Sequence, residues 1–302
     1  MTRDVGDVRG VTRARLTRVL WLVCVVALLG GCSIVKLSYR NADTLTLRWL
    51  NRYADLDAAQ EAFAEERIQE FFVWHRATQL PDYVNWLSAT RSVLQKATVT
   101  PVDMLALNTA ISARLDTATT RALPALAALT LQLRPAQIDA IAAKFARTNA
   151  DFKKDYLDID FEQRQIARYK TVLWLAEVLY GGFSTEQEAT IRRASDARPL
   201  MNELWIEERV ERQRDLLAVL RRIQSEKPTL DTAQALLKAQ ALRATGIAHI
   251  PDPAARARAE SAGAHAAQLA ATIANLTTPE QRQRASAKLT QWASDLKDLA
   301  RD

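Results

Sequence analysis

Glycine is scarce beyond residue 31 of this sequence. The chain has 302 residues and eight glycines, of which four fall within the first 31 positions. Only Gly181, Gly182, Gly246 and Gly263 remain for the rest of the chain. Tight β-hairpin turns and phosphate-binding loops depend on glycine, because they need positive φ angles or a close backbone approach. The distribution therefore argues against β-rich architectures and against nucleotide-binding α/β folds.

The remaining composition favours helices. Apolar residues make up 48% and charged residues 25% of the chain, as in ordinary globular proteins. Ala, Leu, Arg, Gln and Glu dominate, and these are strong helix formers. Apolar residues recur at helical spacing, with no useful stretch of strand-like alternation. We predict an all-α fold, an irregular bundle of about nine to eleven helices in one or two lobes, with helix breaks at Pro81 and Pro124.

The N-terminus has the parts of a secretory signal. Residues 1–18 carry five arginines and two aspartates, and residues 19–29 are apolar. The junction that follows is similar to the lipobox of bacterial lipoproteins, in which the cysteine is lipidated and the signal is cleaved just before it. The residues of this junction are Leu29, Gly30, Gly31 and Cys32. We expect a lipid on Cys32, with an uncleaved anchor as the alternative, because 17 uncharged residues (19–35) reach the lower limit for a membrane span.

Both alternatives leave the basic end in the cytoplasm and the body outside. Ser33, rather than Asp, follows the cysteine, which by the sorting rule of lipoproteins implies the outer membrane, facing the periplasm; an inner-membrane anchor is the fallback. The other cysteine, Cys24, would be lost with the signal, leaving no disulfide. The formal charge of +6 falls by half with the signal, so we do not expect a nucleic-acid partner.

We expect four segments along the chain. These are a signal peptide at 1–31, a lipidated cysteine with its tether at 32–41, a helical core domain at 42–227 and an Ala-rich helical segment at 228–302. The membrane, through the lipid, and envelope proteins are the expected partners.

Catalytic patterns are scarce. The histidines His75, His249 and His265 lack metal-ligand spacing, and His75 suits a packing role beside its aromatic neighbours. His249 could pair with Asp252 in its loop, although a histidine in a loop is more often solvated. The acidic clusters at 65–66, 158–162 and 207–211 suit solvated, salt-bridged helix faces, with Glu208 and Arg212 as one pair. We therefore expect no catalytic residue, no metal, no cofactor and no small-molecule substrate.

Aromatic and polar residues at helical spacing are candidates for a binding groove, although such residues more often pack in a core. Trp49 could instead rest on a bilayer. The candidate groove residues are Trp49, Tyr53, Trp74, His75, Asn149, Phe152 and Tyr156.

A helix-start motif recurs, with a capping residue three positions before a glutamine. It occurs at Asp57–Gln60, Ser184–Gln187, Asp231–Gln234 and Thr278–Gln281, with a partial copy at Arg134–Gln137. Each copy predicts a capping box at the start of a helix. The copy at Thr278 resembles the Leu-Thr/Ser-x-x-Gln helix start of Spy-type periplasmic chaperones, which are small helical cradles that bind unfolded clients.

Three stretches together resemble a family of uncharacterised Gram-negative lipoproteins, the domain-of-unknown-function family six-two-seven-nine. The first runs from Tyr39-Arg40-Asn41 through Trp49-Leu50 to Gln60, the second is Trp74-His75-Arg76 with Leu80-Pro81-Asp82-Tyr83, and the third holds Asn149, Phe152, Lys154 and Tyr156-Leu157. The resemblance covers most of residues 36–225. It implies an all-helical lipoprotein, and the family supplies no activity or residue role that could be carried over.

Three functions follow as hypotheses. The first is a non-enzymatic lipoprotein that binds or scaffolds through a helical groove. The second is a Spy-like holdase chaperone, which requires an exposed apolar groove. The third is a cell-wall hydrolase or lyase that uses a glutamate, which requires two carboxylates facing one cleft.

Overall fold

The computed structural model describes residues 34–302, of which the great majority are helical, and it contains no strand within that range. The predicted all-α class is confirmed. The chain divides into two compact units, of which the first ends at Ala42 and contributes α2 (Ile34–Arg40) to the described residues. The second unit, residues 43–302, holds all that follows. Cys32 and the rest of the predicted lipobox lie outside the described residues, as does the predicted signal peptide.

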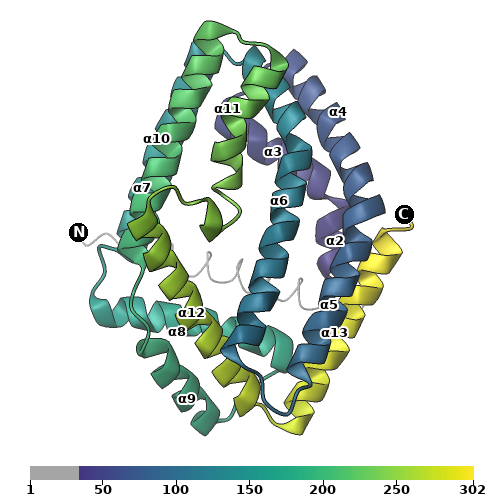
Figure 1. Ribbon diagram of the computed structural model, residues 1–302, viewed down its shortest axis with the longest axis vertical. Helices are drawn as coiled ribbons and strands as arrows, with labels where there is room; N and C mark the ends of the chain where they lie inside the picture. Colours follow the sequence, from purple (N-terminus) through teal and green to yellow (C-terminus); the bar gives the residue numbers. More distant parts are fainter. Residues whose placement is uncertain (1–33) are drawn as a thin grey trace, which may run out of the picture. The chain divides into compact units, whose positions relative to one another are not determined.

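A long helical stretch and its return helix organise the second unit. Helix α4 (Ala58–Trp74) runs through a π-helical turn, η1 (His75–Gln79), directly into α5 (Leu80–Leu94). Helix α6 (Pro101–Gln132) returns alongside and packs against both (Figure 1). Each extra residue in a π turn rotates the side chains that follow by about 100°. The apolar face of α5 therefore points in a different direction from that of α4. This agrees with their packing, since α4 packs on α6 while α5 packs mainly on α13.

The helix break predicted at Pro124 is wrong, whereas near Pro81 one α-helix gives way to another through a π turn. Pro81 lies at the start of α5, where the π turn before it already interrupts the regular α-helical hydrogen bonds. Pro124 lies inside α6 and removes one backbone hydrogen bond from it. Its neighbours Leu123 and Ala127 are almost fully buried, and their packing holds the helix through the proline.

The other helices pack around this pair. Helix α7 packs on α10, α11 on α6, α12 on both α6 and α9, and α13 on α5 and α8. Their bounds are α3 (Ala42–Ala54), α7 (Pro135–Tyr156), α8 (Phe161–Tyr180), α9 (Thr185–Asp196), α10 (Asn202–Glu226), α11 (Leu230–Leu242), the 3-10 turn η2 (Ile247–His249), α12 (Pro253–Leu276) and α13 (Pro279–Leu299). No helix among the described residues is long and apolar enough to span a membrane.

The buried apolar side chains form two cores. The first is made by α3, α4, α6, α7, α10 and α11, and its centre includes Leu123, Ile138 and Ile223. The second is made largely by α5, α8, α9, α12 and α13, with Ile191 and Leu289 near its centre. Residues 228–302 contribute to both cores, because α11 belongs to the first and α12 and α13 belong to the second.

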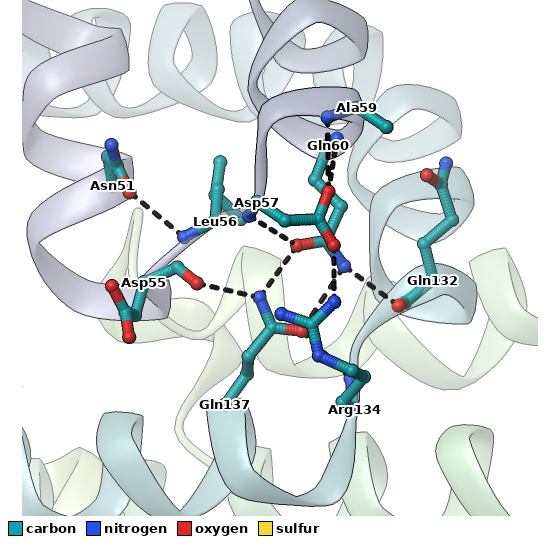
Figure 2. Close-up of polar contacts among 9 residues, drawn as sticks. All are labelled: Asn51, Asp55, Leu56, Asp57, Ala59, Gln60, Gln132, Arg134 and Gln137. Atoms are coloured by element: carbon teal, nitrogen blue, oxygen red, sulfur yellow. Dashed lines mark hydrogen bonds and ion pairs between the residues drawn. The ribbon is translucent and has the colours of Figure 1, made fainter.

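Two pairs of glutamine side chains join helix starts that are far apart in the sequence. We call each pair a glutamine clasp. In the first clasp, Gln137 Nε2 donates to Gln60 Oε1 at 2.6 Å and Gln60 Nε2 donates back to Gln137 Oε1 at 3.2 Å (Figure 2). Each amide also donates to a backbone carbonyl five residues before its partner, Gln60 to Gln132 at 2.8 Å and Gln137 to Asp55 at 2.9 Å. The clasp therefore ties the start of α4 to the start of α7.

The second clasp repeats this pattern between α9 and α13. Gln187 and Gln281 exchange amide hydrogen bonds, and they donate to the carbonyls of Leu276 and Gly182, again five residues before the partner glutamine. The recurring sequence motif thus marks cross-helix pairing as well as capping boxes, which are present at Asp57, Ser184 and Thr278.

The capping box predicted at Asp231–Gln234 is wrong. The cap is two residues earlier, at Thr229, which accepts from the Thr232 amide, so helix α11 begins at Leu230. Within the described chain, no hydrogen bond involves the Gln234 side chain. Gln234 therefore has the sequence context of a clasp residue without being one.

Candidate functional site

An apolar groove of about 360 Å³ lies between α3, α4 and α6. Its lining comes from all three helices. The main apolar residues are Trp49 and Leu50 from α3, Phe63, Ile68, Phe71 and Phe72 from α4, and Pro124, Leu126 and Leu129 from α6. Binding sites for small ligands are typically concave, mostly apolar and about 300–1,000 Å³ in volume. The groove fits this description at its lower end.

The first glutamine clasp lies just beyond one end of this groove, and neither of its glutamines lines the groove. The α3–α4 turn is held there by Asn51, whose Oδ1 accepts from the Leu56 amide at 2.9 Å, and by Asp57, which caps α4 and pairs with Arg134 (Figure 2). Phe63 and Ala64, which line the groove, follow Gln60 within about one turn of α4. The clasp therefore fixes the walls of the groove relative to one another at this end.

Two arginines line the groove, and their surroundings differ. Arg67 pairs with Glu66 at 2.6 Å and with Glu70 at 2.8 Å, and the hydrogen bond to Glu66 raises the pKa of Arg67. Arg121 has no carboxylate partner within the described chain, and its guanidinium lies 5.8 Å from the centre of the Trp74 ring. The positive charge of Arg67 is neutralised, whereas that of Arg121 is not.

Large apolar side chains at the groove remain in contact with water. Trp49 is 56% exposed and Leu126 is 40% exposed. Exposed apolar surface beside a groove is typical of interaction sites rather than of the ordinary surface of a monomer. The groove is therefore the strongest candidate for a functional site.

The structure distributes the predicted groove residues over different places, and Trp49 alone among them lines this groove. Tyr53 lies beside it, with its ring 5.0 Å from that of Trp49 and 5.9 Å from that of Phe145 on α7. Trp74 lies under Arg121. His75 is buried between the rings of neighbours such as Phe71 and Tyr83, and burial lowers the pKa of His75.

The other three predicted residues lie along α7. Asn149 Nδ2 donates to Gln213 Oε1 of α10 at 2.6 Å. The rings of Phe152 and Tyr156 stand 4.9 Å apart, and Arg209 lies over Phe152 at 5.9 Å. These residues support the contact between α7 and α10.

Sequence reasoning missed the α4 and α6 walls of the groove. The aromatic residues of α4 read as an ordinary core face, and only their density could have drawn attention to them. Arg121 carries no sequence signal of its own. Its role emerges only when α6 is placed beside α4.

Two polar pairs predicted from the sequence are replaced in the structure by pairs with other residues. His249 Nε2 lies 3.0 Å from Asp116 Oδ2, so the partner is not Asp252, which caps α12. Burial opposes a lower pKa at Asp116, but hydrogen bonds from Thr245 and His249 lower it overall. Glu208 forms its ion pair with Arg243 at 3.1 Å, not with Arg212 as expected.

Arg243 forms ion pairs with most of the acidic cluster predicted at 207–211. Its buried guanidinium pairs with Glu208, with Glu211 at 3.3 Å and with Asp215 at 2.8 Å. These carboxylates balance one buried cation. No group of side chains among the described residues could hold a metal ion.

These features define a class, an all-α bundle with two glutamine clasps and an apolar groove between its first helices. The chain belongs to the Family of unknown function (DUF6279), whose sequence profile matches residues 52–243. The match includes the α4 and α6 walls of the groove and the whole first clasp. No curated protein and no solved structure matches the chain.

Proposed function

We propose that this protein is an outer-membrane lipoprotein facing the periplasm, which binds a partner or ligand without catalysing a reaction. The observation that carries the binding role is the open apolar groove between α3, α4 and α6, with Trp49 exposed on its rim and Arg121 unneutralised. Full burial of a large apolar side chain is favourable by about 1.5–3 kcal/mol. Contact with a partner that covers Trp49 would therefore be favourable.

The location rests on the N-terminal sequence. The lipobox at 29–32 supplies a lipid anchor at Cys32, and Ser33 directs sorting to the outer membrane. Thr46, the first residue that lines the groove, follows Cys32 by 14 positions. An extended chain of that length spans at most about 50 Å. The groove therefore stays close to the membrane surface.

The anchor is tested by metabolic labelling with tritiated palmitate and by membrane fractionation. We expect label on the wild-type chain in the outer-membrane fraction and none on a Cys32→Ser variant, with Cys24→Ser as the matched control. Equal labelling of the wild-type and Cys32→Ser chains would contradict the anchor.

The binding role is tested by crosslinking in intact envelopes followed by pull-down. We expect a dominant partner or ligand that is lost in a Trp49→Ala variant and kept in Trp205→Ala, since Trp205 is also exposed but lies on α10, away from the groove. The same captured species with both variants would contradict a role for the groove.

A holdase chaperone is the second candidate, because the groove exposes apolar surface and the clasps use the glutamine motif that resembles Spy-type chaperones. It predicts that equimolar protein suppresses the aggregation of an unfolded client such as reduced lactalbumin. Unchanged light scattering in that assay would remove this candidate.

A further inference from the structure

We propose that the groove binds a single-chain fatty acid, with its hydrocarbon chain between α3, α4 and α6 and its carboxylate on Arg121. This assignment rests on the proposed function only in taking the groove as the binding surface. The dimensions of the groove, the distribution of polar residues along it and the charge at one end support this ligand.

The dimensions suit one hydrocarbon chain. On α4 the lining runs from Phe63 to Phe72, which spans about 14 Å at the helical rise of about 1.5 Å per residue. An extended hydrocarbon chain advances about 1.3 Å per carbon, given bonds of about 1.5 Å, so this length holds about eleven carbons. A volume of about 360 Å³ suits one such chain better than the two chains of a phospholipid.

The clasp end of the groove is apolar, whereas Arg67 lines its middle and Glu70 and Arg121 lie towards the other end. Helices α4 and α6 run in opposite directions, because Gln60 contacts Gln132 at one end and Trp74 contacts Arg121 at the other. Ala64 and Leu129 therefore lie at the clasp end, and both are buried. The other end carries Arg121. An amphiphile has the same division between tail and head.

The charge at the open end selects an anion. Glu66 and Glu70, of which Glu70 also lines the groove, both pair with Arg67, so these carboxylates already have a cationic partner. Arg121 faces no carboxylate among the described residues and can offer its planar fork of donors to a carboxylate, which such a fork binds with two parallel hydrogen bonds. The tail of the ligand would then extend from Arg121 towards Ala64 and the clasp.

Photocrosslinking tests both the ligand and its direction. The full chain is placed in phospholipid nanodiscs and labelled with dodecanoate that carries a diazirine on its terminal carbon. We expect the label on the segments 63–68 and 125–129, near the clasp. A diazirine next to the carboxylate should instead label the segments 71–74 and 120–122. Labels outside α3, α4 and α6, or the reverse direction, would overturn the assignment.

Variants test the head-group contact. We expect Arg121→Gln to reduce labelling at low probe concentration about tenfold, because the carboxylate loses its charge-assisted hydrogen bonds. Arg147→Gln is the matched control, because Arg147 is also an exposed helical arginine and lies on α7, outside the groove. Equal labelling of both variants would overturn the role of Arg121.

A groove-filling variant tests the chain site. Ala125→Phe places a ring in the groove and should abolish labelling, while urea unfolding of the same variant shows whether the fold is kept. A folded Ala125→Phe chain that labels as well as wild type would overturn the proposal.

Competitors identify the source of the anionic head group. Unlabelled dodecanoate should displace the probe, and dodecyltrimethylammonium should not. Stronger displacement by dodecanoyl lysophosphatidylglycerol than by dodecanoate would replace the fatty acid with a lysophospholipid and overturn the assignment. Photolabelling reports on the groove, and membrane fractionation reports on the anchor at Cys32, so the two readouts are separate. An unlabelled groove therefore contradicts the ligand, whereas a Cys32→Ser chain that stays in the outer membrane contradicts the anchor.

Discussion

Replacing Gln137 with alanine should destabilise the protein far more than an ordinary helical glutamine substitution. Gln137 is 3% exposed, and its side chain takes part in four hydrogen bonds. It donates to Asp55 O and to Gln60 Oε1, and it accepts from Gln60 Nε2 and from the Arg134 amide at 2.9 Å. The variant therefore leaves several partners without their bonds at a site that water reaches poorly.

The magnitude follows from these contacts. A neutral hydrogen bond contributes about 1 kcal/mol net, and a buried group left without a partner costs about 1–3 kcal/mol. Gln60 keeps its bonds to Gln132 and Asp57, and the Arg134 amide lies at a helix start near water, so not every loss is complete. We expect Gln137→Ala to lower the free energy of unfolding by about 3 kcal/mol, against a total of about 5–15 kcal/mol for a typical domain.

Urea unfolding followed by far-ultraviolet circular dichroism measures this effect. With a slope of about 3 kcal/mol per molar urea, the midpoint should move down by about 1 M. Gln234→Ala is the matched control, because Gln234 shares the sequence motif and makes no side-chain hydrogen bond in the described chain. It should cost less than about 0.5 kcal/mol.

A double-mutant cycle identifies the clasp as the cause. In a Gln137→Ala background, the further change Gln60→Ala should cost at least about 1 kcal/mol less than it does alone, because the shared bonds are already gone. Gln281→Ala belongs to the other clasp and should add its full cost. Equal losses for Gln137→Ala and Gln234→Ala, or strict additivity within the first clasp, would refute the reasoning.

Three further predictions use other sites. Burial raises the pKa of Tyr180 to about 12, so its contribution to stability is complete below pH 10 and is lost as the pH rises through about 12; Tyr180→Phe should remove one late-titrating tyrosine from the absorbance at 295 nm. A hydrogen bond from Lys96, with others from Thr100, lowers the pKa of Asp103 to about 2, so the stability difference between wild type and Asp103→Asn should be present at pH 6 and shrink as the pH falls through 2 in urea titrations. Gly181→Ala should lower the melting temperature, because φ is +81° and a Cβ would lie 2.7 Å from Arg284 Nη1, whereas Gly182→Ala, with nothing within 4 Å, should leave it nearly unchanged.

Local features of the fold were predictable from the sequence. The motifs at Asp57, Ser184 and Thr278 predicted the starts of α4, α9 and α13, because caps act over a few residues. The break at Pro124 was wrong, because the packing of Leu123 and Ala127 outweighs one missing hydrogen bond. A neighbour far away in the sequence decides such a case, and no local pattern reports it.

The candidate site was less predictable for the same reason. Trp49 stood out as an exposed aromatic candidate, but the opposite wall of its groove comes from α6, more than 70 residues later. The glutamine motif was visible in the sequence in four copies. It did not show which glutamines bond to each other, or that the Gln234 side chain has no such bond in the described chain. Arg121 became a candidate only because its guanidinium forms no ion pair with a carboxylate among the described residues, which no local sequence pattern reports.

The long helices have a consequence for how the protein loses its structure. Leu123 and Ala127 of α6 belong to the first core, while Met104 of the same helix packs against the second. The continuous helical stretch of α4, η1 and α5 also runs from the first core to the second. Hydrogen exchange should therefore find amides on both cores opening with one shared free energy, since neither core can melt without unwinding helices that the other needs.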